Sequence, residues 1–365
     1  MHILILSCST GQGHNSAALA IKEAVERRGD TCEFHNALLF LSQIYDRVVC
    51  DGHVFIYKRF PKLFGVGYRF EENHPPTIII NQMKLGVKKF AKFFESKNFD
   101  AIVCTHSFAS LIVNEYKKRS GSKVPLAFVS TDYTCCPGAP ESEADLYFAP
   151  HPLLRDEFES SGIKPESFFP FGIPVSNKFI EKRDKSEARR ELGLPQNRKI
   201  VLLGCGSMGC GPIAKLAALL SRRIPDALIV VVCGNNLRLL ERLTRLEHDN
   251  IIPLPYTKKM ALYIAASDVY ITKAGGLSTT ETILSDVPLL YIDAVPGCET
   301  RNIDFMVGHG FAAAAESHSD VINKVIGILN NPKKALDGVK KCRSALADDP
   351  AEAICAQLEK FLAAK

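Results

Sequence analysis

Short apolar runs alternate along the chain with segments whose apolar residues recur at helical spacing. Strand-like runs lie at 2–6, 101–105, 126–130, 145–149, 199–205, 227–234, 250–254, 269–272 and 288–292, and helical patterns at 15–28, 107–119, 212–223, 236–247, 258–267 and 279–286. Continuous Val, Ile and Leu runs are typical of parallel strands that are buried on both faces. The order of the elements therefore predicts an α/β chain with doubly wound sheets.

A charged stretch at 180–199 interrupts this rhythm, and a new strand and glycine-rich loop follow it. We expect it to be a surface helix and a connection between two Rossmann-like domains, 1–177 and 178–350. The closing segment 351–365 has the pattern of an amphipathic helix that packs back on the first domain. With 365 residues, the chain is long enough for two domains of ordinary size.

The composition is that of a globular protein, with 46% hydrophobic and 23% charged residues. No apolar run approaches the roughly 20 residues of a membrane-spanning helix, and no basic leader precedes the first strand, so we expect a cytoplasmic protein. The 12 cysteines form no CxxC pair. We expect them to be small buried hydrophobes rather than ligands of a metal.

The net charge of +5 is unevenly distributed, because residues 54–97 hold nine Lys and Arg against three acidic residues, together with nine Phe and Tyr. On a helix over 83–94, Met83, Val87, Phe90 and Phe94 form an apolar stripe beside a basic one made of Lys84, Lys88 and Lys92. Such a helix suits an anionic membrane surface, and the apolar stripe has no use on a nucleic acid. The alternative is an ordinary core-facing helix with a solvated lysine side.

Glycine-rich loops follow several of the strand-like runs, where α/β domains bind their ligands. The clearest is "TKAGGLSTTE" (272–281), in which Gly275 and Gly276 allow close approach of a ligand and a helix starts near Ser278. The N–H groups and dipole of that helix suit a diphosphate, and Glu281 suits the hydroxyls of a ribose. The pair Ser278 and Glu281 is equally a capping box that needs no ligand.

Six segments, "GQGHNSAA", "THSF", "TDY", "GIPV", "KAGGLSTTE" and "PGCETRN", occur in an order that resembles the monogalactosyldiacylglycerol synthase and processive diacylglycerol glucosyltransferase family. The resemblance runs from His2 to about Phe311 and extends to the related N-acetylglucosaminyltransferase of peptidoglycan synthesis. It implies a GT-B fold, with two Rossmann-like domains facing across a cleft. It also implies inverting transfer from a UDP-sugar held by the C-terminal domain to a lipid at the N-terminal domain.

For catalysis, the resemblance places His14 near the acceptor hydroxyl, with Gly11 and Gly13 shaping its turn. A histidine of ordinary pKa suits a general base, although His14 could instead cap the helix or support the turn. Asp132 is the second candidate, as the base or as the group that orients it. On the donor side, the expected UDP-sugar residues are Gly206, Ser207, Tyr256, Lys273, Gly275, Gly276, Ser278, Thr279, Glu281, Glu299 and Asn302.

Two departures from the family leave substrate choice open. Cys298 stands where relatives often have Gln, in the segment that contacts the donor sugar, and "TDYTCCPGAPE" lacks the His and aromatic that often follow the Asp. No D-x-D occurs, which fits a site without a metal, where the helix dipole and backbone N–H groups stabilise the departing UDP. We expect no cofactor besides the donor substrate.

We therefore expect a hexosyltransferase that uses UDP-glucose or UDP-galactose and a diacylglycerol-type lipid. We expect it to lie at the inner face of the cell membrane and to bind no nucleic acid. Three alternatives stay open: a transferase for another lipid acceptor such as a polyprenyl-linked one, a UDP-sugar epimerase, and a UDP-sugar-binding regulator without turnover.

Overall fold

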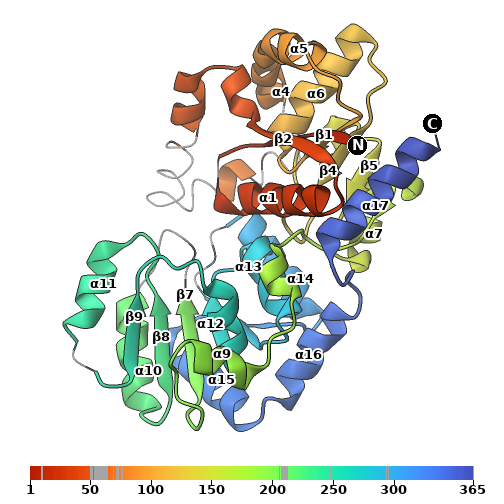
Figure 1. The fold of residues 1–365 in the computed structure, drawn as a ribbon. Helices are drawn as coiled ribbons and strands as arrows, with labels where there is room; N and C mark the ends of the chain where they lie inside the picture. The colour runs from red at the N-terminus through yellow and green to blue at the C-terminus, as the bar shows by residue number, and fades with distance from the viewer. Residues whose placement is uncertain are drawn as a thin grey trace. The chain divides into compact units, whose positions relative to one another are not determined.

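The computed structural model describes residues 1–9, 11–49, 52, 65–68, 70, 74, 77–204, 206, 213–246, 248–292, 294 and 296–364. The chain divides into two compact units, each built around one parallel sheet (Figure 1). The first unit comprises Met1–Asn177, Val295–Cys298 and Leu346–Lys365, and the second comprises Lys178–Ala294 and Glu299–Ala345.

The sheet of the first unit has six strands in the order β2-β1-β3-β4-β5-β6. They are β1 (His2–Ser7), β2 (Thr31–Asn36), β3 (Ala101–Cys104), β4 (Leu126–Val129), β5 (Leu146–Phe148) and β6 (Phe168–Phe169). The central strands β1, β3 and β4 are buried almost along their whole length, as their unbroken apolar runs predict. The order reverses between β1 and β3, so the loops that follow these two strands flank the topological switch point of the sheet.

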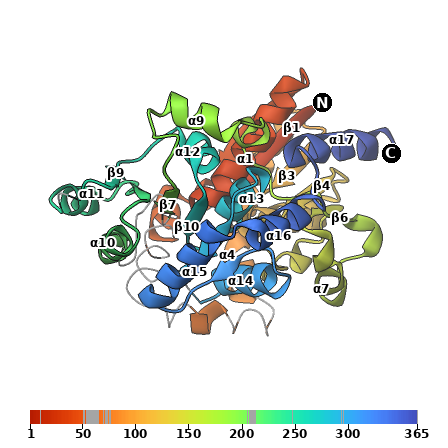
Figure 2. The same cartoon turned by 90° about the horizontal axis from the view of Figure 1, so that it is seen from below.

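Helices α1 (Gln12–Arg27) and α17 (Pro350–Ala363) lie side by side in Figures 1 and 2, although they come from opposite ends of the chain. Both pack on one face of the first sheet, where Ile21 of α1 and Ile354 of α17 join the same core as Ile3 and Val103. Arg27 adds a 2.7 Å hydrogen bond to Asp349 at the edge of this contact. The C-terminal helix is therefore part of the first unit.

Helices α4 (Thr77–Met83) and α5 (Val87–Glu95), joined by the 3-10 turn η2 (Lys84–Gly86), occupy the segment in which one amphipathic helix was expected. The expected apolar stripe is present, but Met83, Val87, Phe90 and Phe94 are all buried. Phe90 and Phe94 pack edge-to-face with the Tyr116 ring of α6 (Ser107–Ser120), at ring-centroid distances of 5.2 and 5.4 Å. The prediction that this stripe faces a membrane was wrong, because these side chains complete the core.

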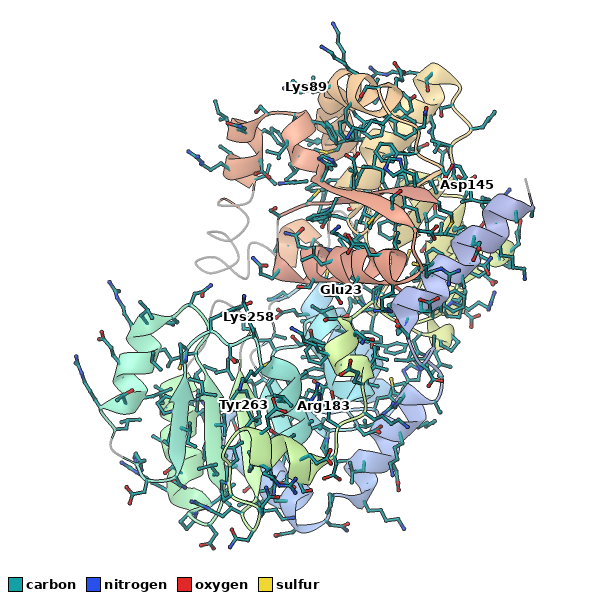
Figure 3. The ribbon with its side chains drawn as sticks, viewed as in Figure 1. Glu23, Lys89, Asp145, Arg183, Lys258 and Tyr263 are labelled. Atoms are coloured by element: carbon teal, nitrogen blue, oxygen red, sulfur yellow. The ribbon has the colours of Figure 1, made fainter. Side chains whose placement is uncertain are left out.

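Asp145, which is labelled in Figure 3, connects the start of β4 to helix α6. Its carboxylate accepts the backbone N–H of Leu126 and the ammonium of Lys117, both at 2.8 Å. A carboxylate that accepts such charge-assisted bonds is satisfied away from the ligand-binding end of the sheet.

The sheet of the second unit has the order β12-β11-β10-β7-β8-β9. Its strands are β7 (Ile200–Gly204), β8 (Leu228–Val232), β9 (Ile251–Leu254), β10 (Val269–Thr272), β11 (Leu289–Tyr291) and β12 (Ala313–Ala314). If β7 is numbered as the first strand and the sheet is read from β9 to β12, the order is 3-2-1-4-5-6, as in dinucleotide-binding folds. The switch point of this order lies between β7 and β10. The helices α10 (Ile213–Arg223), α11 (Leu237–Thr244) and α15 (His318–Asn330) share one core with these strands.

The charged stretch at 180–199 is not simply a surface connection. It forms helix α9 (Lys185–Glu191), which packs on α12 (Met260–Ala266). Arg189 of α9 is buried and donates to the Asp268 carboxylate at 2.7 Å and to the Ala266 carbonyl at 2.9 Å. This buried, paired charge fixes α9 to the segment between α12 and β10.

No helix among the described residues has the length and apolarity needed to cross a bilayer. None of the described cysteines is part of a disulfide: Cys8, Cys104, Cys233, Cys342 and Cys355 are buried, and Cys32, Cys135, Cys136 and Cys298 are partly exposed. Only part of the set therefore fits the expected role of small buried hydrophobes.

Candidate functional site

The first cluster of polar groups lies at the switch point of the first sheet. Helix α1 begins at Gln12, and its N-cap Gly11 has an extended backbone with no side-chain capping bond. His14 is thus in the first turn of the helix and does not cap it. Gly13 precedes it within the same turn, half-buried like His14 itself.

The His14 ring is held by the loops that follow β3 and β4. Its Nδ1 lies 2.9 Å from the Thr105 carbonyl oxygen and 2.8 Å from the Thr131 hydroxyl. The Thr105 hydroxyl donates in return to the His14 carbonyl, at 3.1 Å. A carbonyl oxygen only accepts, so Nδ1 carries the proton, and the neutral ring keeps its lone pair on Nε2.

The charge state of His14 follows from its surroundings. Burial lowers the pKa of His14 below 6.5, while the Asp132 carboxylate and the bond to Thr105 oppose that shift. The ring is accordingly neutral at pH 7, and a proton arriving on Nε2 would be stabilised by the negative charge of Asp132. The two catalytic candidates from the sequence thus lie in one electrostatic environment.

Sequence reasoning missed three residues around this ring: Thr105, Thr131 and His106. The His106 ring lies edge-on to His14, with centroids 4.5 Å apart. Its Nδ1 accepts the N–H of Phe108 at 3.1 Å and so caps α6. The loops "THS" and "STD" were visible as strand ends, but nothing in the sequence indicated which of their side chains meet His14.

The second cluster lies at the switch point of the second sheet. Helix α13 (Gly276–Leu284) begins two residues before the expected start, and its N-cap Gly275 provides no side-chain capping bond. Ser278 is inside the helix, so the capping-box alternative for Ser278 and Glu281 is wrong. An uncapped helix start that follows two glycines is a site where backbone N–H groups can receive a phosphate.

Two of the expected donor residues hold this loop in shape. Asn302 of α14 (Cys298–Gly308) is fully buried, and its amide donates to the Ala274 carbonyl at 2.7 Å. Thr279 is also buried, and its hydroxyl lies 2.8 Å from the Tyr291 hydroxyl. Both side chains are therefore engaged with the protein: Asn302 holds the turn before α13, and Thr279 connects α13 to β11.

Glu281 lies in the second turn of α13, and its side chain is half-buried. Burial raises the pKa of Glu281 to about 8. The carboxyl group is thus largely protonated at neutral pH, and a ligand whose hydroxyl groups donate to it would favour the ionised form. This is an unusual state for a carboxyl group of a helix and marks Glu281 as a functional candidate.

The other expected donor residues are distributed around these two. Gly206 follows β7 with a φ of +69°, which favours glycine. Lys273, Ser278 and Glu299 are half-buried, and Tyr256 is 59% exposed after β9. Ser207 lies outside the described residues, as do residues 54–64 of the basic region.

Two doubly wound parallel sheets, with polar groups at the switch point of each, are the architecture of the GT-B fold. Residues 14–175 match the family model of monogalactosyldiacylglycerol (MGDG) synthase, and residues 200–294 match that of the glycosyltransferase family 28 C-terminal domain. Both units of the chain thus match glycosyltransferase families. The fold, the family and the enzyme class expected from the sequence are confirmed.

Individual relatives agree with this placement. The chain is 27% identical to a processive diacylglycerol beta-glucosyltransferase from Bacillus pumilus, over 94% of this chain and 90% of that protein. Among solved structures, MurG from Acinetobacter baumannii matches with a TM-score of 0.64 at 15% identity, covering 98% of this chain and 99% of that one. A UDP-GlcNAc 2-epimerase from Neisseria meningitidis matches with 0.63 at 12% identity, covering 99% and 100%. At such identities these two structures share the fold alone with this chain.

Proposed function

We propose that this protein transfers a hexose, with inversion, from UDP-glucose or UDP-galactose to a diacylglycerol-type lipid. The observation that carries the proposal is the His14 ring, which is neutral and whose Nδ1–H is bound to the Thr105 carbonyl. An imidazole fixed in this way presents a basic Nε2, the group that removal of a proton from an alcohol requires.

The step balances as a single displacement. The acceptor hydroxyl gives its proton to Nε2 of His14 while its oxygen bonds to the anomeric carbon. The bond from that carbon to the diphosphate oxygen breaks, and UDP leaves with the electron pair. The Asp132 carboxylate favours the imidazolium that forms, since its charge raises the pKa of His14.

The donor belongs to the second unit in this proposal. The uncapped start of α13 receives the diphosphate, and its N–H groups and dipole stabilise the charge that develops on the leaving group. Glu281 accepts hydrogen bonds from the ribose. No metal or further cofactor enters this mechanism.

The first unit supplies a surface suited to a membrane. Of the twelve exposed large hydrophobic side chains in the described part of the chain, seven fall within residues 39–85: Leu39, Ile44, Val48, Val66, Phe70, Ile78 and Leu85. Lys88 and Lys92 are exposed on the next helix, whereas Lys89 (Figure 3) donates to the Leu41 carbonyl at 2.8 Å. Exposed apolar and ammonium groups in one stretch of the chain favour a peripheral position on an anionic membrane, here the inner face of the cell membrane.

Replacing Lys88 and Lys92 with Ala should weaken binding to vesicles that contain anionic lipid by about 1 kcal/mol per charge, roughly 30-fold in total at low salt. We leave Lys84 in place, because it is half-buried and donates to Asn81 at 3.1 Å. Co-sedimentation at low and high salt measures the effect, which screening should remove at high salt. Replacing the exposed pair Lys333 and Lys334 is the matched control; an equal loss in that variant would exclude a specific basic surface on α5.

The pH dependence of transfer should report His14. The rate at saturating donor should fall as the pH drops through a pKa below 6.5, because the protonated ring cannot accept the acceptor's proton. Asp132→Asn removes a charge that raises this pKa, so the acidic limb of the profile should move to lower pH as the maximum rate falls. An acidic limb that stays in place, or moves up, would show that Asp132 does not act on the catalytic base.

The reaction itself is tested by incubating the protein with labelled UDP-glucose or UDP-galactose and with vesicles that contain diacylglycerol. Labelled glycolipid supports the proposal, and the sugar that is accepted identifies the hexose. Label found only in an epimerised nucleotide sugar, or only on a polyprenyl-linked acceptor offered in parallel, would contradict it.

A further inference from the structure

Two cysteines and an aspartate that are far apart in the sequence meet in the first unit. Asp132 and Cys136 lie in the loop that follows β4, and Cys298 opens α14 in a segment that belongs to the same unit. One carboxylate oxygen and the two sulfur atoms all lie within 4.8 Å of one another, and the three side chains are half-buried. The two thiols are in hydrogen-bonding contact.

We propose that Asp132, Cys136 and Cys298 bind Zn²⁺, and that occupation of this site inhibits sugar transfer. Around a tetrahedral zinc ion with ordinary bond lengths, neighbouring sulfur and oxygen ligands lie about 3.5–3.8 Å apart. The three ligand atoms need to approach one another by at most about 1.3 Å to reach that spacing. Rotation of the side chains supplies such a movement without a change of backbone.

The donor set selects the metal. Two thiolates and one carboxylate favour zinc and similar soft divalent ions over Mg²⁺ and Ca²⁺, which prefer oxygen alone. On binding, each thiol releases one proton to solvent, and the carboxylate binds as it is. Three protein ligands leave the fourth position open to water.

A fourth side chain supports the sulfur of Cys298. The Tyr68 hydroxyl is buried, has no nitrogen or oxygen partner in the described part of the chain, and lies beside the Cys298 thiol. A hydroxyl in this position can donate to a thiolate once zinc has removed the thiol proton, as outer hydrogen bonds do in metal sites.

Asp132 has two roles here: it is a ligand of the zinc ion and, in the proposed function, it favours the protonated form of His14. The inhibition follows from this combination and rests on the proposed function. Asp132 directly follows Thr131, whose hydroxyl lies 2.8 Å from Nδ1 of His14, so zinc on the Asp132 carboxylate replaces a negative charge near this ring with a positive one. The imidazolium that proton transfer forms is disfavoured as a result. Zinc should thus slow transfer without competing with UDP, which the second unit binds.

The binding test uses the full chain, stripped with a chelator and kept reduced by a phosphine. Competition against a chromogenic chelator should show one tightly bound Zn²⁺ per chain, and Co²⁺ should give the charge-transfer absorption of a thiolate complex. Cys136→Ser and Cys298→Ser should each weaken binding by more than about 100-fold, because the loss of a supporting hydrogen bond alone costs about 10- to 100-fold. Cys135→Ser, in the same loop, is the matched control and should bind as the parent does.

A measurement on the unaltered protein covers the case in which a serine variant fails to fold. Zinc should protect Cys136 and Cys298 from alkylation while Cys135, also half-buried, reacts at an unchanged rate, as read by peptide mass spectrometry. Equal protection of all three cysteines, or tight binding that survives both serine substitutions, would overturn the site. Tight binding at the site without inhibition would instead leave the metal site standing and contradict the proposed role of Asp132.

Discussion

His14→Ala is expected to lower turnover by about 10²–10⁴-fold, the usual contribution of a positioned general base. The ring is neutral, its Nδ1–H is bound to the Thr105 carbonyl, and Nε2 is the remaining basic atom. UDP affinity should barely change, because the nucleotide is assigned to the second unit. Single-turnover transfer and calorimetric UDP binding should be measured on the same folded variant.

His106→Ala is the informative control for that experiment. The two rings are 4.5 Å apart, so a nonspecific disturbance of the switch point should affect both variants. Nδ1 of His106 accepts the Phe108 N–H, which places the proton of its neutral ring on Nε2 and leaves no basic nitrogen there. We expect this variant to lose about 1 kcal/mol of stability with its helix cap, and less than about tenfold in turnover.

Near-parental transfer in His14→Ala would exclude His14 as the base and move that role to Asp132. A loss of UDP binding in the same variant would mean that the roles of the two units are assigned the wrong way round. Equal losses in His14→Ala and His106→Ala would point to the shape of the loop rather than to proton transfer.

The strands could be predicted from the sequence where they are buried on both sides. All nine expected runs overlap strands, because parallel central strands such as β1 and β7 are continuously apolar. β2 escaped prediction because its sequence "TCEFHN" is polar and only half-buried. β6 and β12 were missed because two residues are too few to form a pattern.

The catalytic candidate could be found from the sequence, but its environment could not. A histidine in a glycine-rich turn after the first strand pointed to His14. Its bonding partners, Thr105 and Thr131, are 91 and 117 residues away, and no local pattern relates such distant loops. The prediction that the apolar stripe on 83–94 faces a membrane was wrong for a related reason: an amphipathic helix has one apolar face whether a core or a membrane covers it.

We expect the Glu281 carboxyl to be required for nucleotide binding and to lower the stability of the nucleotide-free protein at high pH. Glu281→Ala should weaken UDP binding by about 1.5–3 kcal/mol, roughly 10- to 150-fold, because it removes a charge-assisted contact with the ribose. Isothermal titration calorimetry measures the change. Since α13 starts at Gly276 without a side-chain cap, loss of a capping box cannot account for the result.

The same residue has a stability effect whose sign follows from its pKa. The folded protein raises the pKa of Glu281 from 4.5 to about 8, so it binds this proton more tightly than the unfolded chain does. The stability that the proton contributes is complete below pH 4.5 and is lost as the pH rises through about 8. Glu281→Gln carries no such charge, so without nucleotide it should be more stable than the parent above about pH 8, by at least about 1 kcal/mol or 2–4 °C in thermal midpoint.

Measuring the stability of the parent and of Glu281→Gln at two pH values tests this effect. At about pH 4.5 the parent carboxyl is protonated when folded, and the advantage of Glu281→Gln should largely vanish. Near pH 9 the advantage should be greatest, and saturating UDP should reduce it, because the nucleotide stabilises the parent more than the variant. If Glu281→Ala binds UDP with the affinity of the parent, Glu281 does not belong to the donor site. A variant that is less stable than the parent at high pH would show that the ionised carboxylate already has a favourable partner in the free protein.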